Sequence, residues 1–134
     1  MTTTAKNSIK KRIHSAAMSF VFAFRGLKQV LMQESNLRLE LALGILTLIA
    51  CALFNCSTTE WALVLLCCAL VLSSEIFNSV VEEFLDWKYP EEDKIVGKIK
   101  DMAAAAPLVA SLFAFAIGGV IFFPKILKLI NTFL

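Results

Sequence analysis

Three long apolar stretches constrain the fold of this 134-residue chain more than any other feature. They cover about residues 37–54, 61–84 and 103–123. A helix needs roughly 17–25 apolar residues to cross a hydrocarbon core of about 30 Å, and a backbone in lipid must satisfy its own hydrogen bonds. The hydrophobic share, 58%, exceeds the roughly 45–50% of soluble domains, which excludes intrinsic disorder and an ordinary water-soluble core. The pattern predicts an all-α membrane protein with one domain, residues 1–134, and three transmembrane helices.

The three predicted spans differ in polarity. The first is interrupted only by Arg38 and Glu40 near its start, whereas the second becomes polar from Ser73 onward. The third carries no charge, and its Pro107 is expected in the first helical turns, where a missing backbone N–H costs least. Charged side chains within the predicted membrane region therefore come from the first two spans.

Basic residues in the connections predict the orientation. The connection Asn55–Glu60 has none, whereas residues 1–38 hold seven and the loop Asp86–Asp101 holds four. Cytoplasmic loops are enriched in Lys and Arg, so the N-terminus and the second loop are expected in the cytoplasm. Three spans then place the C-terminus outside, where Lys125 and Lys128 depart mildly from the rule.

Residues 8–33, approximately, are predicted to form an amphipathic helix on the cytoplasmic membrane surface, with its cations near anionic head groups. Their apolar residues recur with helical spacing at Ile13, Ala17, Phe20, Phe24, Leu27 and Leu31. A basic start followed by an apolar run also resembles a signal peptide, but no A-x-A cleavage site follows. The surface helix is therefore the favoured interpretation.

Several common sites are disfavoured. The four cysteines form no CxxC motif and lie mostly within spans, so they are expected to be packing residues rather than a disulfide framework or a zinc site. His14 is the only histidine, which excludes a histidine-based metal site or catalytic triad. The chain has neither GxxxxGK[ST] nor a kinase glycine-rich loop, so any ATP chemistry needs another architecture.

A polar stripe in the second span is the most informative motif. Glu75, Asn78, Glu82 and Asp86 are spaced at i, i+3, i+7 and i+11, which places them within about 80° on one helix face, while Glu83 points elsewhere. A charge in the bilayer interior costs on the order of 3 kcal/mol or more, so intramembrane acids are rare and usually functional. The alternative is a set of polar residues that hold helices together.

The composition of this membrane face suits phosphoryl transfer. That chemistry needs a metal such as Mg²⁺, cations near the phosphates and a base at the accepting hydroxyl. Interfacial acids can hold Mg²⁺, the basic loop can face a nucleotide, and the deeper Glu75 can meet a lipid hydroxyl. Further charged residues lie near the starts of the first and third spans, namely Glu34, Arg38, Glu40, Lys94, Lys98, Lys100 and Asp101.

The chain resembles the small prokaryotic diacylglycerol kinase family, which includes the undecaprenol kinases, over about residues 19–123. The resemblance rests on the motifs E-x-x-x-R-x-E from Glu34, E-x-x-N-x-x-x-E-x-x-x-D from Glu75, and K-D-M-A-A-A from Lys100. It implies a homotrimer in the bacterial inner membrane, with active sites shared between protomers and ATP bound on the cytoplasmic side. The implied partners are a membrane lipid, ATP and Mg²⁺, and no nucleic acid is expected.

The resemblance also implies residue roles. Glu75 is the expected general base, and Glu34 and Glu82 are the expected metal ligands. The lipid substrate is expected to contact Arg38, Glu40 and Glu75. The expected nucleotide-binding positions are Glu34, Asn78, Glu82, Asp86, Glu91, Glu92, Asp93, Lys100 and Asp101.

Two segments depart from the family pattern. Residues 90–93, Pro-Glu-Glu-Asp, lack the usual tyrosine and histidine of the nucleotide loop, and the alanines of 103–106 replace a common Ser or Gly. The tracts 34–38 and 57–61 are more similar to the undecaprenol kinase branch, so undecaprenol is favoured as substrate over diacylglycerol. The alternatives are a diacylglycerol kinase or a non-enzymatic transporter that uses Glu75 for proton coupling.

Overall fold

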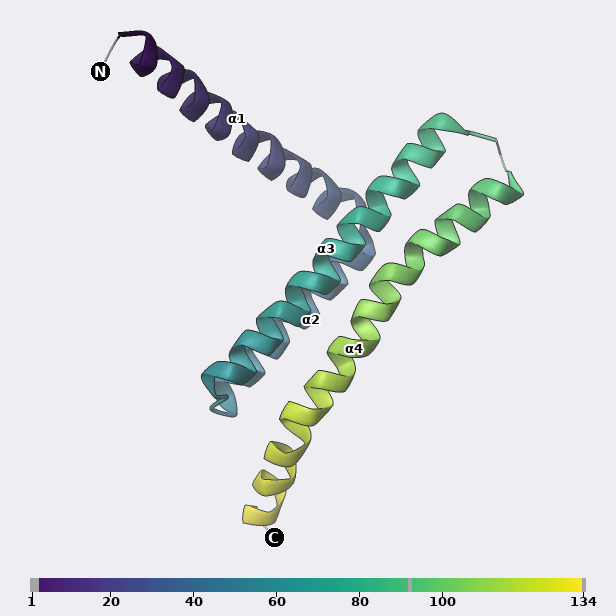
Figure 1. Cartoon of the computed structure of the whole chain (residues 1–134). Helices are drawn as coiled ribbons and strands as arrows, with labels where there is room; N and C mark the ends of the chain where they lie inside the picture. Colours follow the sequence, from purple (N-terminus) through teal and green to yellow (C-terminus); the bar gives the residue numbers. More distant parts are fainter. Residues whose placement is uncertain (1–2, 92, 134) are drawn as a thin grey trace. The chain divides into compact units, whose positions relative to one another are not determined.

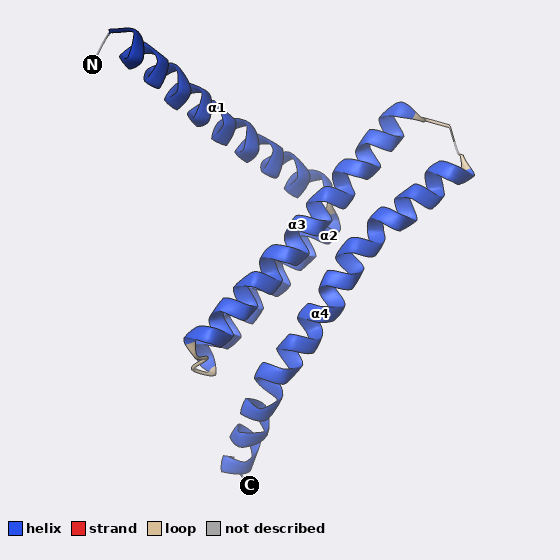
Figure 2. Ribbon diagram, viewed as in Figure 1, coloured by secondary structure: helices blue, strands red, loops and turns tan. Residues whose placement is uncertain are grey.

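The computed structural model describes the backbone of residues 3–91 and 93–133 and the side chains of residues 17–91 and 93–132. These ranges contain four helices and no strand (Figures 1 and 2). The helices are α1 (Thr3–Gln33), α2 (Ser35–Leu53), α3 (Thr58–Lys88) and α4 (Lys94–Phe133). Residues 1–35 form one compact unit and residues 36–134 a second, and each is described by itself. Within the described ranges α2, α3 and α4 are long and apolar enough to cross a membrane, which confirms the three predicted spans.

The helices extend beyond the predicted spans at the loop between the second and the third. Most of the predicted loop 86–101 is helical, since α3 continues to Lys88 and α4 begins at Lys94. Tyr89 ends α3 because it precedes Pro90, whose ring disfavours helical backbone at the preceding residue. Asp93 caps α4, because its Oδ1 accepts hydrogen bonds from the backbone N–H groups of Ile95 (2.6 Å) and Val96 (3.3 Å).

Pro107 lies well inside α4 rather than in its first turns, so that expectation was wrong. The reason is the early start of α4 at the Asp93 cap. Pro107 and Pro124 both interrupt the helical hydrogen-bond ladder because proline has no N–H. Such prolines are tolerated in membrane helices where neighbouring helices and local adjustment compensate, and Pro107 is buried.

The turn between α2 and α3 is built from two local motifs. Asn55 has a left-handed φ of 47°, its N–H donates to the Ala52 carbonyl (3.3 Å), and the Cys56 N–H donates to the Cys51 carbonyl (2.9 Å). This pattern is a Schellman motif, which closes the end of α2. Ser57 and Glu60 then form a capping box: Ser57 Oγ accepts from the Glu60 N–H (3.3 Å), and Glu60 Oε2 accepts from the Ser57 N–H (2.6 Å).

The apolar core of the second unit lies beside this turn, where α2, α3 and α4 meet. Cys51, Val64 and Ile121 are buried together, one from each helix. Lys125 Nζ pairs with Glu60 Oε2 at 3.1 Å, which ties α4 to α3. Glu60 thereby supplies a countercharge for Lys125, one of the two lysines that depart from the rule used to predict the orientation. From this end α3 and α4 run antiparallel, side by side, to residues 89–93 (Figure 1).

Replacing Ser57 by Ala is expected to lower the free energy of unfolding by about 1 kcal/mol, because the first turn of α3 loses its side-chain acceptor. Unfolding in mixed micelles titrated with sodium dodecyl sulfate measures the change. Thr59→Ala, at an exposed position in the same turn, is the matched control and should shift stability by less than about 0.5 kcal/mol. Equal losses in the two variants would contradict the capping role.

Candidate active site

One face of α3 carries a run of polar side chains whose exposure increases along the helix. Glu75 and Asn78 are 4% and 9% exposed, Glu82 is half-buried, and Asp86 is exposed. Asn78 Nδ2 donates a hydrogen bond to Glu82 Oε1 (3.0 Å), which confirms that Asn78 and Glu82 share a face of the helix. Glu83 is exposed instead. Because burying a polar group costs free energy, a row of buried polar side chains on one face of α3 indicates a functional role for that face.

Ser79 also belongs to the buried part of α3, and the sequence analysis missed it. It is 6% exposed, and its Oγ donates to the Glu75 backbone carbonyl at 2.9 Å. The signal available in the sequence was its position four residues after Glu75, one helical turn away. Ser79 therefore satisfies its own hydroxyl within the helix, next to the carboxylate stripe.

Two buried side-chain oxygens in the described part of the chain have no hydrogen-bond partner: Asn78 Oδ1 and Glu40 Oε2. Buried polar atoms are nearly always paired, so such atoms call for an explanation. The carboxylate of Glu40, on α2, lies close enough to that of Glu75, on α3, for their charges to interact. The buried site therefore contains oxygen acceptors from two helices.

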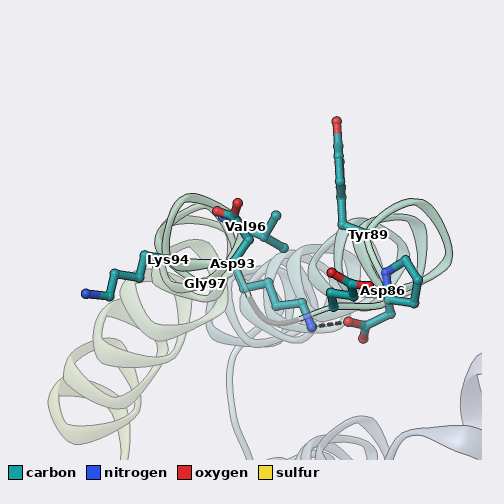
Figure 3. A pocket seen from close by; sticks show the side chains of 9 residues that line it. Asp86, Tyr89, Asp93, Lys94, Val96 and Gly97 are labelled. Atoms are coloured by element: carbon teal, nitrogen blue, oxygen red, sulfur yellow. Dashed lines mark hydrogen bonds and ion pairs between the residues drawn. The ribbon is translucent and has the colours of Figure 1, made fainter.

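A pocket of about 500 Å³ lies where α3 ends and α4 begins (Figure 3). In it, Lys100 of α4 forms an ion pair with Asp86 of α3, across 14 positions of sequence. The Tyr89 side chain projects away from Asp86. The volume is within the roughly 300–1,000 Å³ of small-molecule sites. The lining residues are Asp86, Tyr89, Pro90, Glu91, Asp93, Lys94, Val96, Gly97 and Lys100.

The comparison with known proteins places the chain in a family. The model of the prokaryotic diacylglycerol kinase family matches residues 21–122, a range that contains the polar stripe of α3 and every residue of the pocket lining. The chain belongs to this family. Among its relatives are a diacylglycerol kinase of Synechocystis sp. (28% identical, over 93% of this chain and 74% of the relative) and the undecaprenol kinase of Bacillus subtilis (31%, over 81% and 88%). A Helicobacter pylori diacylglycerol kinase is 32% identical over 66% of this chain and 69% of the relative.

The structure brings the predicted site residues of this diacylglycerol kinase family member together in two groups. One is the buried group, defined as the buried Glu75 and Asn78 with the half-buried Glu40 and Glu82; the other is the pocket, which contains Asp86, Glu91, Asp93 and Lys100. Arg38 and Asp101 are exposed on α2 and α4, outside the pocket lining. Glu34 belongs to the first unit, and Glu92 lies outside the described residues. The pocket also includes Pro90 and Lys94, from the predicted nucleotide loop and basic segment, and Tyr89, Val96 and Gly97, which were not predicted.

The donor atoms of the buried group suit a hard cation. Among the side chains of residues 17–91 and 93–132, no cluster of three or more His, Cys, Asp or Glu residues is placed to hold a metal. Mg²⁺ does not require such a cage, because it usually binds one or two carboxylates together with substrate phosphates. The Glu82 carboxylate and the unpartnered Asn78 Oδ1 are neighbouring oxygen donors of this kind.

Proposed function

We propose that the chain is an ATP- and Mg²⁺-dependent membrane lipid kinase that transfers the γ-phosphate to the primary hydroxyl of a lipid alcohol. The observation that carries the proposal is the continuous polar face of α3, which leads from the pocket at Asp86 to the buried Glu75. These two residues are 11 positions apart, or about 16 Å along a helix. A nucleotide at one end and a lipid hydroxyl at the other would meet along this face.

The pocket supports nucleotide binding at the exposed end of that face. Lys100 supplies a cation, and its contact with Asp86 holds the ammonium group within the pocket. Asp93 Oδ1 is already engaged in capping α4, which limits its use as a contact for the nucleotide. The nucleoside is therefore assigned to the pocket, and the phosphates point along α3 toward Glu82 and Asn78.

Glu82 and Asn78 are the residues of the second unit that would hold Mg²⁺ beside the phosphates; the role of Glu34 as a second carboxylate rests on the family motif alone. When bound, Mg²⁺ offsets the negative charge that develops on the transferred phosphoryl group. The hydrogen bond from Asn78 Nδ2 orients the Glu82 carboxylate and leaves Asn78 Oδ1 available as a metal ligand. This arrangement accounts for an otherwise unpartnered buried oxygen.

Glu75 is the proposed general base. Its carboxylate accepts the proton of the lipid hydroxyl as the hydroxyl oxygen attacks the γ-phosphorus. Burial excludes water, which would otherwise compete as the phosphoryl acceptor. Arg38 and Glu40, on α2, are assigned to positioning the lipid head, because the charges of Glu40 and Glu75 are close enough to interact.

The same proposal includes the membrane arrangement. Residues 1–134 act as one domain in the bacterial inner membrane, with the N-terminus and residues 89–93 in the cytoplasm and the C-terminus outside. The exposed Phe20 and Phe24 of α1 support a surface helix whose aromatic side chains enter the lipid. In a homotrimer, neighbouring protomers would cover part of the apolar surface of α2 to α4 and complete each active site.

Undecaprenol is the proposed substrate, with diacylglycerol as the alternative. The tracts 34–38 and 57–61 support this preference, and relatives carry both names. The test incubates purified protein with labelled ATP, Mg²⁺ and separate micelles of the two lipids. Faster labelling of undecaprenol is expected. Faster labelling of diacylglycerol would reverse the preference, and no labelling of either lipid would refute the kinase.

Replacing Lys100 by Met is expected to raise the KM for ATP by about 10- to 100-fold, the effect of losing one charge-assisted hydrogen bond. The KM for the lipid should change little, because the pocket lies at the far end of the polar face from Glu75. Steady-state kinetics with each substrate varied in turn measure both constants. Lys98→Met is the matched control, since Lys98 is exposed on α4 and absent from the pocket lining. Equal effects in both variants would argue against a specific nucleotide contact.

A further inference from the structure

We propose that Cys51 and Cys56 form a reversible disulfide that fastens the end of α2 to the turn before α3. This site is separate from the kinase machinery, because it lies at the opposite end of the helices from the pocket. The sequence alone favoured packing roles for all four cysteines. The structure changes that interpretation for this pair, because it places the two side chains together.

The Schellman motif at the end of α2 is the geometric basis. In this motif the N–H of the second residue after the cap (C″) donates to the carbonyl of a residue in the last helical turn (C3). The side chains of C″ and C3 are frequently in contact. Cys56 and Cys51 occupy these two positions, joined by the 2.9 Å backbone hydrogen bond. The Cys56 side chain packs against the buried cluster that contains Cys51, and the two thiols interact directly. Neighbouring backbones and facing sulfurs are what a disulfide requires.

The remaining two cysteines serve as an internal comparison. Cys67 and Cys68 are consecutive in α3, so their side chains leave the helix about 100° apart and do not face one another. All four thiols are free in this structure, which represents the reduced state. Closeness in the sequence would therefore favour Cys67 and Cys68, whereas the geometry of the turn favours Cys51 and Cys56 as the pair that forms a disulfide.

The compartment supplies the second argument, and this step rests on the orientation in the proposed function. With residues 89–93 in the cytoplasm, the α2–α3 turn faces the outside, where disulfides form and persist. Cys51 is fully buried, whereas Cys56 is half-buried, so an oxidant reaches Cys56 first.

The chemistry is thiol–disulfide exchange with a disulfide-bearing oxidant outside the cytoplasm. The Cys56 thiolate attacks one sulfur of the oxidant, releases one oxidant thiol and forms a mixed disulfide. The Cys51 thiolate then attacks Cys56 Sγ and releases the second oxidant thiol. Two protons and two electrons pass to the oxidant in total. The product links the end of α2 to the residue that precedes the α3 cap, beside the core shared by α2, α3 and α4.

The test measures the thiol state in the expressing bacterium. Cells are lysed into denaturant that contains an excess of an alkylating reagent, so that buried thiols are also alkylated. The protein is then digested and analysed by mass spectrometry without reduction. We expect a peptide that contains Cys51 and Cys56 without alkyl groups and lacks two hydrogen atoms, whereas Cys67 and Cys68 are alkylated. Alkylation of Cys51 and Cys56 in most molecules would overturn the proposal.

Two variants and one topology measurement sharpen the result. Cys56→Ser should leave Cys51 alkylated and lipid phosphorylation unchanged, whereas Cys67→Ser should retain the Cys51–Cys56 link. Loss of the link in Cys67→Ser would assign the disulfide to other sulfurs and refute the pair. After reduction, a membrane-impermeant maleimide should label wild-type protein in intact spheroplasts, and Cys56→Ser much less. Labelling of Cys56 only in inverted vesicles would contradict both the orientation and the redox site, yet would leave the kinase assignment intact.

Discussion

Glu75→Gln is expected to lower the rate of lipid phosphorylation by about 10²- to 10⁴-fold, the usual contribution of a general base. Glutamine has nearly the same size as glutamate, so the packing of α3 should be retained. Its amide cannot accept the proton of the lipid hydroxyl, so the loss should appear in kcat. Initial rates with labelled ATP and saturating lipid measure the effect.

Glu83→Gln is the matched control for this experiment. Glu83 is on the same helix, one position from Glu82, but it is exposed and off the polar face. The same substitution there should leave the rate nearly unchanged. Circular dichroism and size-exclusion chromatography should show that both variants keep the helical content and assembly of the wild type. Undiminished turnover in Glu75→Gln would remove Glu75 from the chemistry and would favour another acid, such as Glu40, whose charge interacts with that of Glu75.

Glu82→Gln is expected to raise the Mg²⁺ concentration for half-maximal activity by about 10- to 100-fold. Losing even a partner of a metal ligand commonly costs this much in metal affinity or activity. In the wild-type protein Asn78 Nδ2 donates to Glu82 Oε1 at 3.0 Å. The substitution removes the negative charge but keeps an oxygen that can accept this hydrogen bond. The structural disturbance should therefore be small and the electrostatic loss large. Activity titrated with Mg²⁺ at fixed ATP measures the shift.

The response to added Mg²⁺ separates the two acids. Excess Mg²⁺ should partly restore Glu82→Gln, because weaker binding is offset by mass action. It should not restore Glu75→Gln, because the missing group is a proton acceptor. An unchanged Mg²⁺ dependence in Glu82→Gln would argue that the oxygens of this group bind something other than the metal.

The polar stripe could be predicted from the sequence because its order is helical and local. Residues three or four apart on a helix are neighbours, so the spacing of Glu75, Asn78 and Glu82 sufficed to place them on one face. Asp93 was read as part of a loop, although an acid followed by an apolar run is also a helix-start signal. That cap lengthened α4 and moved Pro107 into its interior.

By itself, therefore, the sequence determined the three membrane spans, the one-sided stripe of α3 and the family, because hydrophobic length, helical period and motif spacing are properties of short segments. Only the tertiary structure decided which distant residues meet. It paired Asp86 with Lys100 and Glu60 with Lys125, and it formed the pocket between the end of α3 and the start of α4. The physical reason is that a contact between two helices depends on their packing and on the turns that join them, which no single helical pattern contains.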